Sequence, residues 1–296
     1  MRLSLVTLTA LLLSGCAADR PKESFSKMAS EFVYTSLANS PVAATQTGYH
    51  QHGNVRLDAV LDDYSPHGIE EMRRWYTDFR LRLLRSVDVQ TLSQDERADY
   101  DILFNQISLA LLELQSIQSY RHNPTIYVEL VGNAIYSPYV LEYADKDERY
   151  RHITARLKGI PALMAQARQN LVSVPDLWRG VAIEENQGNV SLIDGVVRQG
   201  CPIQLRPEYD EAAKSAIAAL HAFSSWLQRD LSGGFYDWRL GKDLYAQKFR
   251  FVLATDSTPG QVLAAAEDGM RRMRSEMYEI ARTLPGGGSG AQDQNS

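Results

Sequence analysis

The sequence lacks several features that mark particular classes of protein. Only two of its 296 residues are cysteine, which excludes a small domain held together by disulfides. It has no excess of positive charge, because 36 Asp and Glu outnumber 31 Lys and Arg and give a formal net charge of -5. Phosphate binding needs clustered cations, so we expect no nucleic acid as a partner. The 44% hydrophobic content is ample for a buried core.

Local motifs of the common enzyme classes are also lacking. There is no G-x-S-x-G elbow, P-loop or dinucleotide fingerprint, and none of the six histidines stands in a His-Glu-x-x-His arrangement. That spacing would bring two imidazoles to one zinc ion, so we assign no catalytic and no metal-binding residue. The nearest approaches are His50 with His52, and Glu184 with Glu185. An enzyme that uses Glu184 or the histidine pair stays as an alternative without a specific spacing to support it.

The N-terminus has the pattern of an export signal. Arg2 supplies an early positive charge, and a short apolar run then leads to the tetrapeptide LSGC, which ends at Cys16. This tetrapeptide resembles the bacterial lipobox, where the signal is cut and the cysteine thiol is acylated. We therefore predict a signal peptide over 1–15, lipidation of Cys16 and a lipidated linker over 16–24. The acyl chains would make membrane lipid a partner.

Lipidation of Cys16 leaves Cys201 without a partner, and we expect Cys201 to be a buried or half-buried thiol. Ala17 follows the lipidated cysteine, where aspartate would favour retention in the inner membrane. We therefore predict an exported lipoprotein on the periplasmic face of the cell envelope, in the outer membrane.

The remainder of the chain has helical rather than strand periodicity, with widely spaced turn signals. This pattern predicts an all-α fold, a multi-helix array over 25–285. A Gly/Ser-rich stretch at 286–296 predicts a flexible tail.

Several turn signals locate helix ends. The pair Ser65-Pro66, the run Ser93–Glu96 and the run Thr258–Gln261 each combine residues that cap a helix N-terminus. Segment 121–139 contains Asn-Pro, Gly-Asn and Ser-Pro pairs, so we predict a structured loop there. Pro161 predicts a kink or a break in the helix around it.

The last predicted helix carries a narrow apolar stripe, which we call the α-seam. Its members recur at alternating steps of three and four residues, namely Leu263, Ala266, Met270, Met273, Met277, Ile280 and Leu284. Thioethers can bind Cu(I), but helix packing explains the spacing and is our interpretation. The sequence leaves open whether the α-seam packs within this chain or against a missing half. If it is exposed, we expect instability or aggregation.

Short runs of residues are spread in a characteristic order over most of the chain. They are Ser40–Thr45 with Gly48 and His50, Leu61-Asp62 with Ser65, Leu92-Ser93 with Asp99–Asp101, Asn123-Pro124 with Tyr127, Trp178 with Ala182–Glu184 and Gly188, and Phe235 with Arg239–Gly241 and Leu244-Tyr245. In this order they resemble the N-terminal half of a family of exported bacterial proteins, domain-of-unknown-function family 885 (DUF885).

The resemblance implies one half of a larger helical, zinc-peptidase-like fold. Members of the family are about twice as long, and their C-terminal half carries a His-Glu-x-x-Pro-Gly-His-His (HExxPGHH) motif. No position here matches that motif, so no zinc ligand is carried over. We expect a truncated or split scaffold half that is not catalytic alone. Zinc is expected only when a separately encoded C-terminal half is bound. The alternative is a periplasmic binding module that holds a peptide-like ligand without enzymatic activity.

Overall fold

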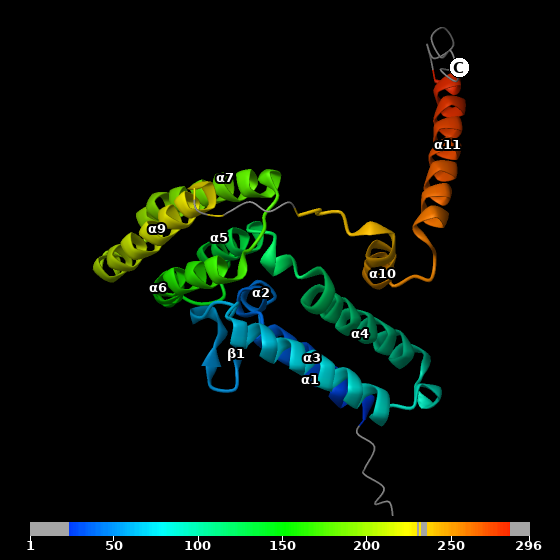
Figure 1. Ribbon diagram of the computed structural model, residues 1–296, viewed down its shortest axis with the longest axis horizontal. Helices are drawn as coiled ribbons and strands as arrows, with labels where there is room; N and C mark the ends of the chain where they lie inside the picture. The colour runs from blue at the N-terminus through cyan, green and yellow to red at the C-terminus, as the bar shows by residue number, and fades with distance from the viewer. Residues whose placement is uncertain (1–23, 230, 232–235, 285–296) are drawn as a thin grey trace, which may run out of the picture.

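The computed structural model describes residues 24–229, 231 and 236–284, and nearly all of its elements are helical (Figure 1). The α-helices are α1 (Phe25–Ala38), α2 (Pro41–Gln46), α3 (Pro66–Ser86), α4 (Gln94–Leu112), α5 (Thr125–Val140), α6 (Lys146–Asn170), α7 (Asp176–Leu192), α8 (Arg198–Gly200), α9 (Arg206–Arg229), α10 (Gly241–Leu253) and α11 (Pro259–Thr283). The predicted all-α class is confirmed.

Short elements connect these helices. A two-stranded antiparallel hairpin is formed by β1 (Gln51–His52) and β2 (Val55–Arg56). The 3-10 turns are η1 (Leu57–Ala59), η2 (Val89–Thr91) and η4 (Ser119–Arg121), and the π-helical turns are η3 (Glu113–Ile117) and η5 (Ile193–Val197).

The helices pack as two groups, each around its own hydrophobic core. In the first group, α5, α6, α7 and α9 surround buried side chains such as Tyr127, Ile153 and Phe223. In the second group, α1, α3 and α4 surround Phe32 and Phe79, among others. Figure 1 shows the first group in green and yellow and the second in blue to teal, with α10 and α11 forming an arm beside them. We call these the α5–α9 group, the α1–α4 group and the arm.

A single buried arginine connects the N-terminal segment to the α5–α9 group. Arg156 of α6 is 0% exposed, and its guanidinium donates five hydrogen bonds of 2.7 to 3.3 Å. The acceptors are the carbonyls of Pro41, Leu57, Val60 and Ala134 and the hydroxyl of Thr45. Because a buried charge must be solvated by protein groups, this side chain fixes α2 and η1 against α5 and α6.

The structure overturns the predicted loop at 121–139, most of which is helix α5. Asn123 lies two residues before this helix, and its Oδ1 accepts hydrogen bonds from the backbone N–H and hydroxyl of Thr125, the first residue of α5. Pro138 lies inside α5 and cannot donate to the carbonyl of Ala134, four residues earlier. Arg156 Nη1 donates to that carbonyl at 3.0 Å, so tertiary contact replaces the missing helical bond.

The three predicted helix starts are confirmed. Ser65 caps α3, and capping boxes begin α4 at Ser93 and α11 at Thr258.

The expected break at Pro161 is absent, since α6 runs through it as one helix. Among the described residues, no helix is both long enough and apolar enough to cross a membrane.

We expect replacement of Arg156 by leucine to cost about 3–5 kcal/mol of unfolding free energy, because it orphans the carbonyl acceptors and leaves the buried Asp58 carboxylate without its nearby cation. Urea unfolding monitored by circular dichroism measures the change. The control is Arg151→Leu, which alters an exposed residue of the same helix and should cost less than about 0.5 kcal/mol. A loss below about 1 kcal/mol for Arg156→Leu would show that the network is not needed for stability.

Candidate functional site: a cleft between the two helical groups

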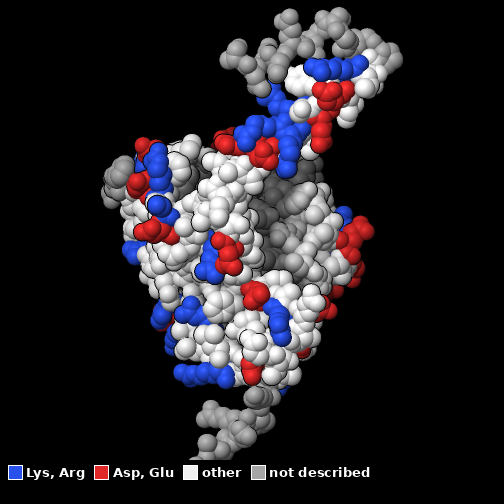
Figure 2. Space-filling model, turned by 90° about the vertical axis from the view of Figure 1, so that its right-hand side faces the viewer, with Lys and Arg blue, Asp and Glu red and all other residues white. Residues whose placement is uncertain are grey.

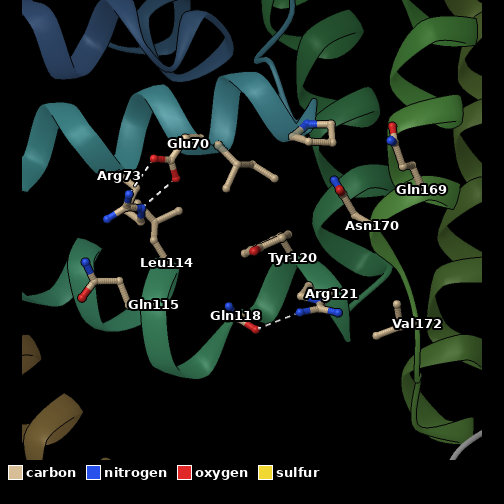
Figure 3. Close-up of a pocket in the computed structure, with 12 residues that line it drawn as sticks. Glu70, Arg73, Leu114, Gln115, Gln118, Tyr120, Arg121, Gln169, Asn170 and Val172 are labelled. Carbon is tan, nitrogen blue, oxygen red and sulfur yellow. Dashed lines mark hydrogen bonds and ion pairs between the residues drawn. The ribbon is translucent and has the colours of Figure 1, made fainter.

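A cleft of about 520 Å³ opens where the α1–α4 and α5–α9 groups meet (Figure 3). Its walls come from the start of α3, the turns after α4 and the end of α6. The lining residues are Pro66, Ile69, Glu70, Arg73, Leu114, Gln115, Gln118, Tyr120, Arg121, Gln169, Asn170 and Val172. The volume lies within the range of about 300–1,000 Å³ that is typical of small-ligand sites.

The chain reversal after α4 builds one wall of this cleft. Helix α4 passes into the π-helical turn η3, and Gln118 then adopts a left-handed conformation with φ 53° and ψ 45°. This conformation is unfavourable for a residue other than glycine, and π-helical turns are enriched at functional sites. Turn η4 follows, so that Gln118 and Arg121 border the cleft together, with Arg121 Nη1 donating to Gln118 Oε1 at 3.3 Å (Figure 3).

The charged side chains of the cleft differ in their pairing. Glu70 and Arg73 of α3 form a two-point ion pair, with Arg73 Nε 2.8 Å from Glu70 Oε2 and Arg73 Nη2 2.5 Å from Glu70 Oε1. Arg121 makes no ion pair with any residue that the structure describes, and its guanidinium donates a hydrogen bond to the neutral amide of Gln118. The cleft therefore contains one guanidinium whose charge is not balanced by a nearby carboxylate.

A second group of ionisable residues lies beneath the β1–β2 hairpin. Asp58 is wholly buried, and its Oδ1 accepts a hydrogen bond from Thr45 Oγ1 at 2.8 Å and lies 2.9 Å from His50 Nδ1. The Tyr143 hydroxyl lies 3.0 Å from His152 Nδ1. Burial lowers the pKa of His152 and raises the pKa of Tyr143. Both pKa shifts favour the neutral forms of these two side chains.

Asp62 joins this group from the following loop. Its Oδ1 accepts the backbone N–H of Val42 at 3.0 Å, which ties the loop to the start of α2. Burial raises the pKa of Asp62 to about 6, against the smaller opposing effects of that hydrogen bond and of the Arg156 charge.

The two histidines singled out from the sequence do not form a metal pair. His50 contacts Asp58, whereas His52 Nδ1 lies 2.8 Å from the hydroxyl of Tyr49. Within residues 24–229, 231 and 236–284, no three His, Cys, Asp or Glu side chains are arranged to hold a metal ion. The described residues therefore do not fit the zinc that the family resemblance implies, and we derive no step through zinc.

The adjacent glutamates point in different directions, as their spacing predicts. Glu184 is exposed, while its neighbour Glu185 is half-buried. Burial, with Glu129 and Glu184 nearby, raises the pKa of Glu185. The less exposed carboxylate of the pair is therefore Glu185. The prediction for Cys201 is confirmed, since it is a buried free thiol whose pKa burial raises.

The methionines of the α-seam are not core residues in this chain. Met270, Met273 and Met277 are 57%, 60% and 63% exposed, and no residue of α11 is buried. Figure 2 shows the arm projecting from the body, with charged side chains crowded on the face in view. The α-seam is therefore not packed against residues 24–229, 231 or 236–284, so within this part of the chain the apolar stripe is exposed.

Some sequence predictions fall outside the described residues. They concern Cys16, the signal peptide 1–15, most of the linker 16–24, Phe235 and the tail 286–296.

The cleft itself could not be predicted from the sequence. Nothing local marks Arg121 or Gln118, because their role depends on α3 and α6 approaching from distant parts of the chain.

Fold and site together define a class: an all-helical protein with two packed groups, an open cleft between them and an arm with an exposed apolar stripe. A model of the family described as "Bacterial protein of unknown function (DUF885)" matches residues 41–294, and the chain belongs to this family. The comparison with curated proteins gave no match.

Among solved structures, the chain is similar to a protein described as "a putative lipoprotein of unknown function from Shewanella oneidensis". The TM-score is 0.74 at 24% sequence identity, over 89% of this chain and 50% of that one. The likeness establishes the fold. The chain spans about half the length of the solved structure that it matches.

We expect stability to fall with rising pH because of Asp62. Its pKa is raised from 3.8 to about 6 in the folded state, so the folded chain holds this proton more tightly than the unfolded chain. This stabilisation is complete below the unfolded pKa and is lost as the pH rises through the folded pKa. Asp62→Asn keeps a carbonyl acceptor for Val42 but has no proton to lose.

The variant should therefore gain about 1–2 kcal/mol relative to the native chain between pH 4 and pH 7, less than the full shift implies because the side chain is half-buried. Urea unfolding at both pH values measures the difference. Parallel pH profiles for the two chains would contradict the assignment to Asp62.

Proposed function

We propose that this chain is the scaffold half of an exported lipoprotein and that it is completed by a second helical half docked on the α-seam. The observation that carries the proposal is the exposure of the whole apolar stripe of α11. A helix of 25 residues with no buried residue gains little from packing, although packing supplies most helical stability in proteins. A helical partner would bury the stripe by the packing that its three-and-four spacing suits.

Two further observations support a second half as the occupant of the α-seam. The solved lipoprotein is about twice as long as the part that this chain matches, so a second half exists in that protein. The α-seam is flanked by charged residues that form pairs along the helix, such as Arg272 with Asp268 and Arg282 with Glu279. An apolar stripe bordered by charges is typical of helix pairs with a defined register.

The described residues indicate which role this chain would have in the assembly and which role the second half would have. They supply a cleft wall with two arginines, one glutamate, glutamines and aliphatic side chains, but no metal ligand set. In the proposed assembly, a metallopeptidase-like activity would depend on the second half, and this chain would hold a peptide-like ligand. The chain alone would not be catalytic.

A binding module without enzymatic activity is the second candidate function. The cleft favours it, because Arg121 and the neutral amides around it suit ligand binding without any catalytic group. The two candidates differ in whether a partner on the α-seam is needed for activity.

The proposed location is the periplasmic face of the cell envelope, in the outer membrane, with Cys16 acylated. The LSGC tetrapeptide supports the anchor, and the description of the solved relative as a lipoprotein agrees with it.

Charge placed on the α-seam should test the docking proposal. We expect the mature chain, made without lipid, to bind the dye ANS strongly and to form a complex with the half of the Shewanella protein that it does not match. The double variant Met273→Glu, Met277→Glu should lower ANS fluorescence at least threefold and abolish the complex in size-exclusion chromatography with light scattering.

The matched control is Ser275→Glu, which adds charge on the opposite side of α11, because successive helical residues are about 100° apart. This variant should behave like the native chain. ANS binding and association that are unaffected by the methionine substitutions, or equally affected by Ser275→Glu, would refute docking through the α-seam.

Replacement of Cys16 by serine should abolish lipidation, because serine has no thiol for the acyl transfer. We expect the native protein to incorporate labelled palmitate and to partition into the detergent phase of Triton X-114, and the variant to do neither. Cys201→Ser is the control and should be labelled normally. Equal labelling of native protein and Cys16→Ser would refute the anchor.

A further inference from the structure

We propose that the cleft between the two helical groups binds a peptide by its C-terminal carboxylate, with Arg121 as the group that recognises the anion. This inference rests on the proposed role of the cleft as a ligand site and is independent of docking on the α-seam. It assigns the ligand a chemical class and an orientation.

The balance of charge in the cleft is the first reason. The Glu70 carboxylate is occupied by Arg73 through two contacts. The carboxylate of Glu113, in the adjacent π-helical turn, accepts hydrogen bonds from Ser119 Oγ and Lys248 Nζ. Arg121 is the charged lining residue that has no ion pair within the described part of the chain, and this leaves one positive charge for a ligand with one negative charge. A carboxylate matches the planar guanidinium with two parallel hydrogen bonds.

The neutral amide side chains in the cleft are the second reason to propose a peptide ligand. Gln115, Gln118 and Gln169 line the cleft with side chains that both donate and accept hydrogen bonds. Figure 3 shows these groups on different sides of the same space. Such groups suit the alternating N–H and C=O of a peptide backbone, whereas a sugar phosphate or another dianion would leave one negative charge unmatched.

Aliphatic side chains give the third reason. Ile69 of α3, Leu114 of η3 and Val172 beyond α6 also line the cleft. They offer apolar contact to the side chain next to the carboxylate. The site should therefore prefer a peptide that ends in an aliphatic residue.

The position of Arg121 is set by the backbone around it. Gln118 Oε1 accepts from Arg121 Nη1, and the carbonyl of Arg121 accepts the N–H of Val172 at 3.1 Å. The second bond joins η4 to the chain after α6 and does not involve the arginine side chain. A substitution of the side chain therefore removes the guanidinium and leaves this backbone contact in place.

The test compares one peptide in two forms. An N-terminally fluorescein-labelled hexapeptide that ends in leucine is titrated with the mature, lipid-free chain as the free acid and as the C-terminal amide. Fluorescence anisotropy reports Kd. We expect the free acid to bind at least tenfold more tightly than the amide, because a paired guanidinium and carboxylate contribute a tenfold or larger factor.

Arg121→Gln should weaken binding of the free acid to the level of the amide and leave amide binding unchanged. Arg121→Lys should retain part of the preference, because it keeps the charge and loses the planar fork. Arg151→Gln, which removes an exposed charge outside the cleft, should leave both affinities unchanged. If Arg121→Gln fails to fold, Gln118→Ala removes the acceptor that orients Arg121 and should reduce the preference several-fold.

The outcomes separate this inference from the proposed function. Equal affinities for acid and amide in the native chain would overturn carboxylate recognition and leave the ligand cleft standing. Failure of both peptides to bind would overturn carboxylate recognition and the ligand role of the cleft. A preference for the acid that survives in Arg121→Gln would overturn the assignment to Arg121.

Discussion

The burial of Arg156 is the constraint on which most of this fold depends. A guanidinium without access to water needs acceptors for its N–H groups, and this one finds them in four carbonyls and a hydroxyl that come from α2, η1, the loop after it and α5. The hydroxyl of Thr45 lies between Arg156 Nη2 and the carboxylate of Asp58, so the two buried charges are connected through one side chain. Several residues that carry the family resemblance, including Pro41, Thr45 and His50, therefore serve this network.

The sequence predicts a structural feature when the residues that cause it lie close together in the chain. Helix starts at Ser65, Ser93 and Thr258 were predictable, because a cap is made by side chains within four residues of the backbone that they satisfy. Helix α5 was not, because two of its unfavourable residues are compensated from elsewhere. The carbonyl freed by Pro138 is taken by Arg156, and Gly132 lets Asn189 of α7 approach to 2.9 Å from where a Cβ would lie.

The candidate site was beyond prediction for the same reason. Arg73, Arg121 and Asn170 are ordinary polar residues on three separate elements, and only the packing of α3 and α6 around the turns after α4 gives them a common cleft. Helix α11 differs from the cleft, because its helical structure can be predicted from the local sequence. Its local pattern predicts the helix and the apolar face correctly, but no local pattern specifies what the face meets. Whether that face is exposed depends on where the described helices far away in the sequence pack.

One contact between the arm and the rest of the chain lies next to the cleft. Lys248 of α10 donates to Glu113 of η3, and the same carboxylate accepts from Ser119 of η4. Turn η4 continues to Arg121, and Gln118 lies between the two turns, so the residues that define the cleft wall are attached to α10 through Glu113. Glu113 therefore holds α10 and the turn that leads to the guanidinium through one carboxylate.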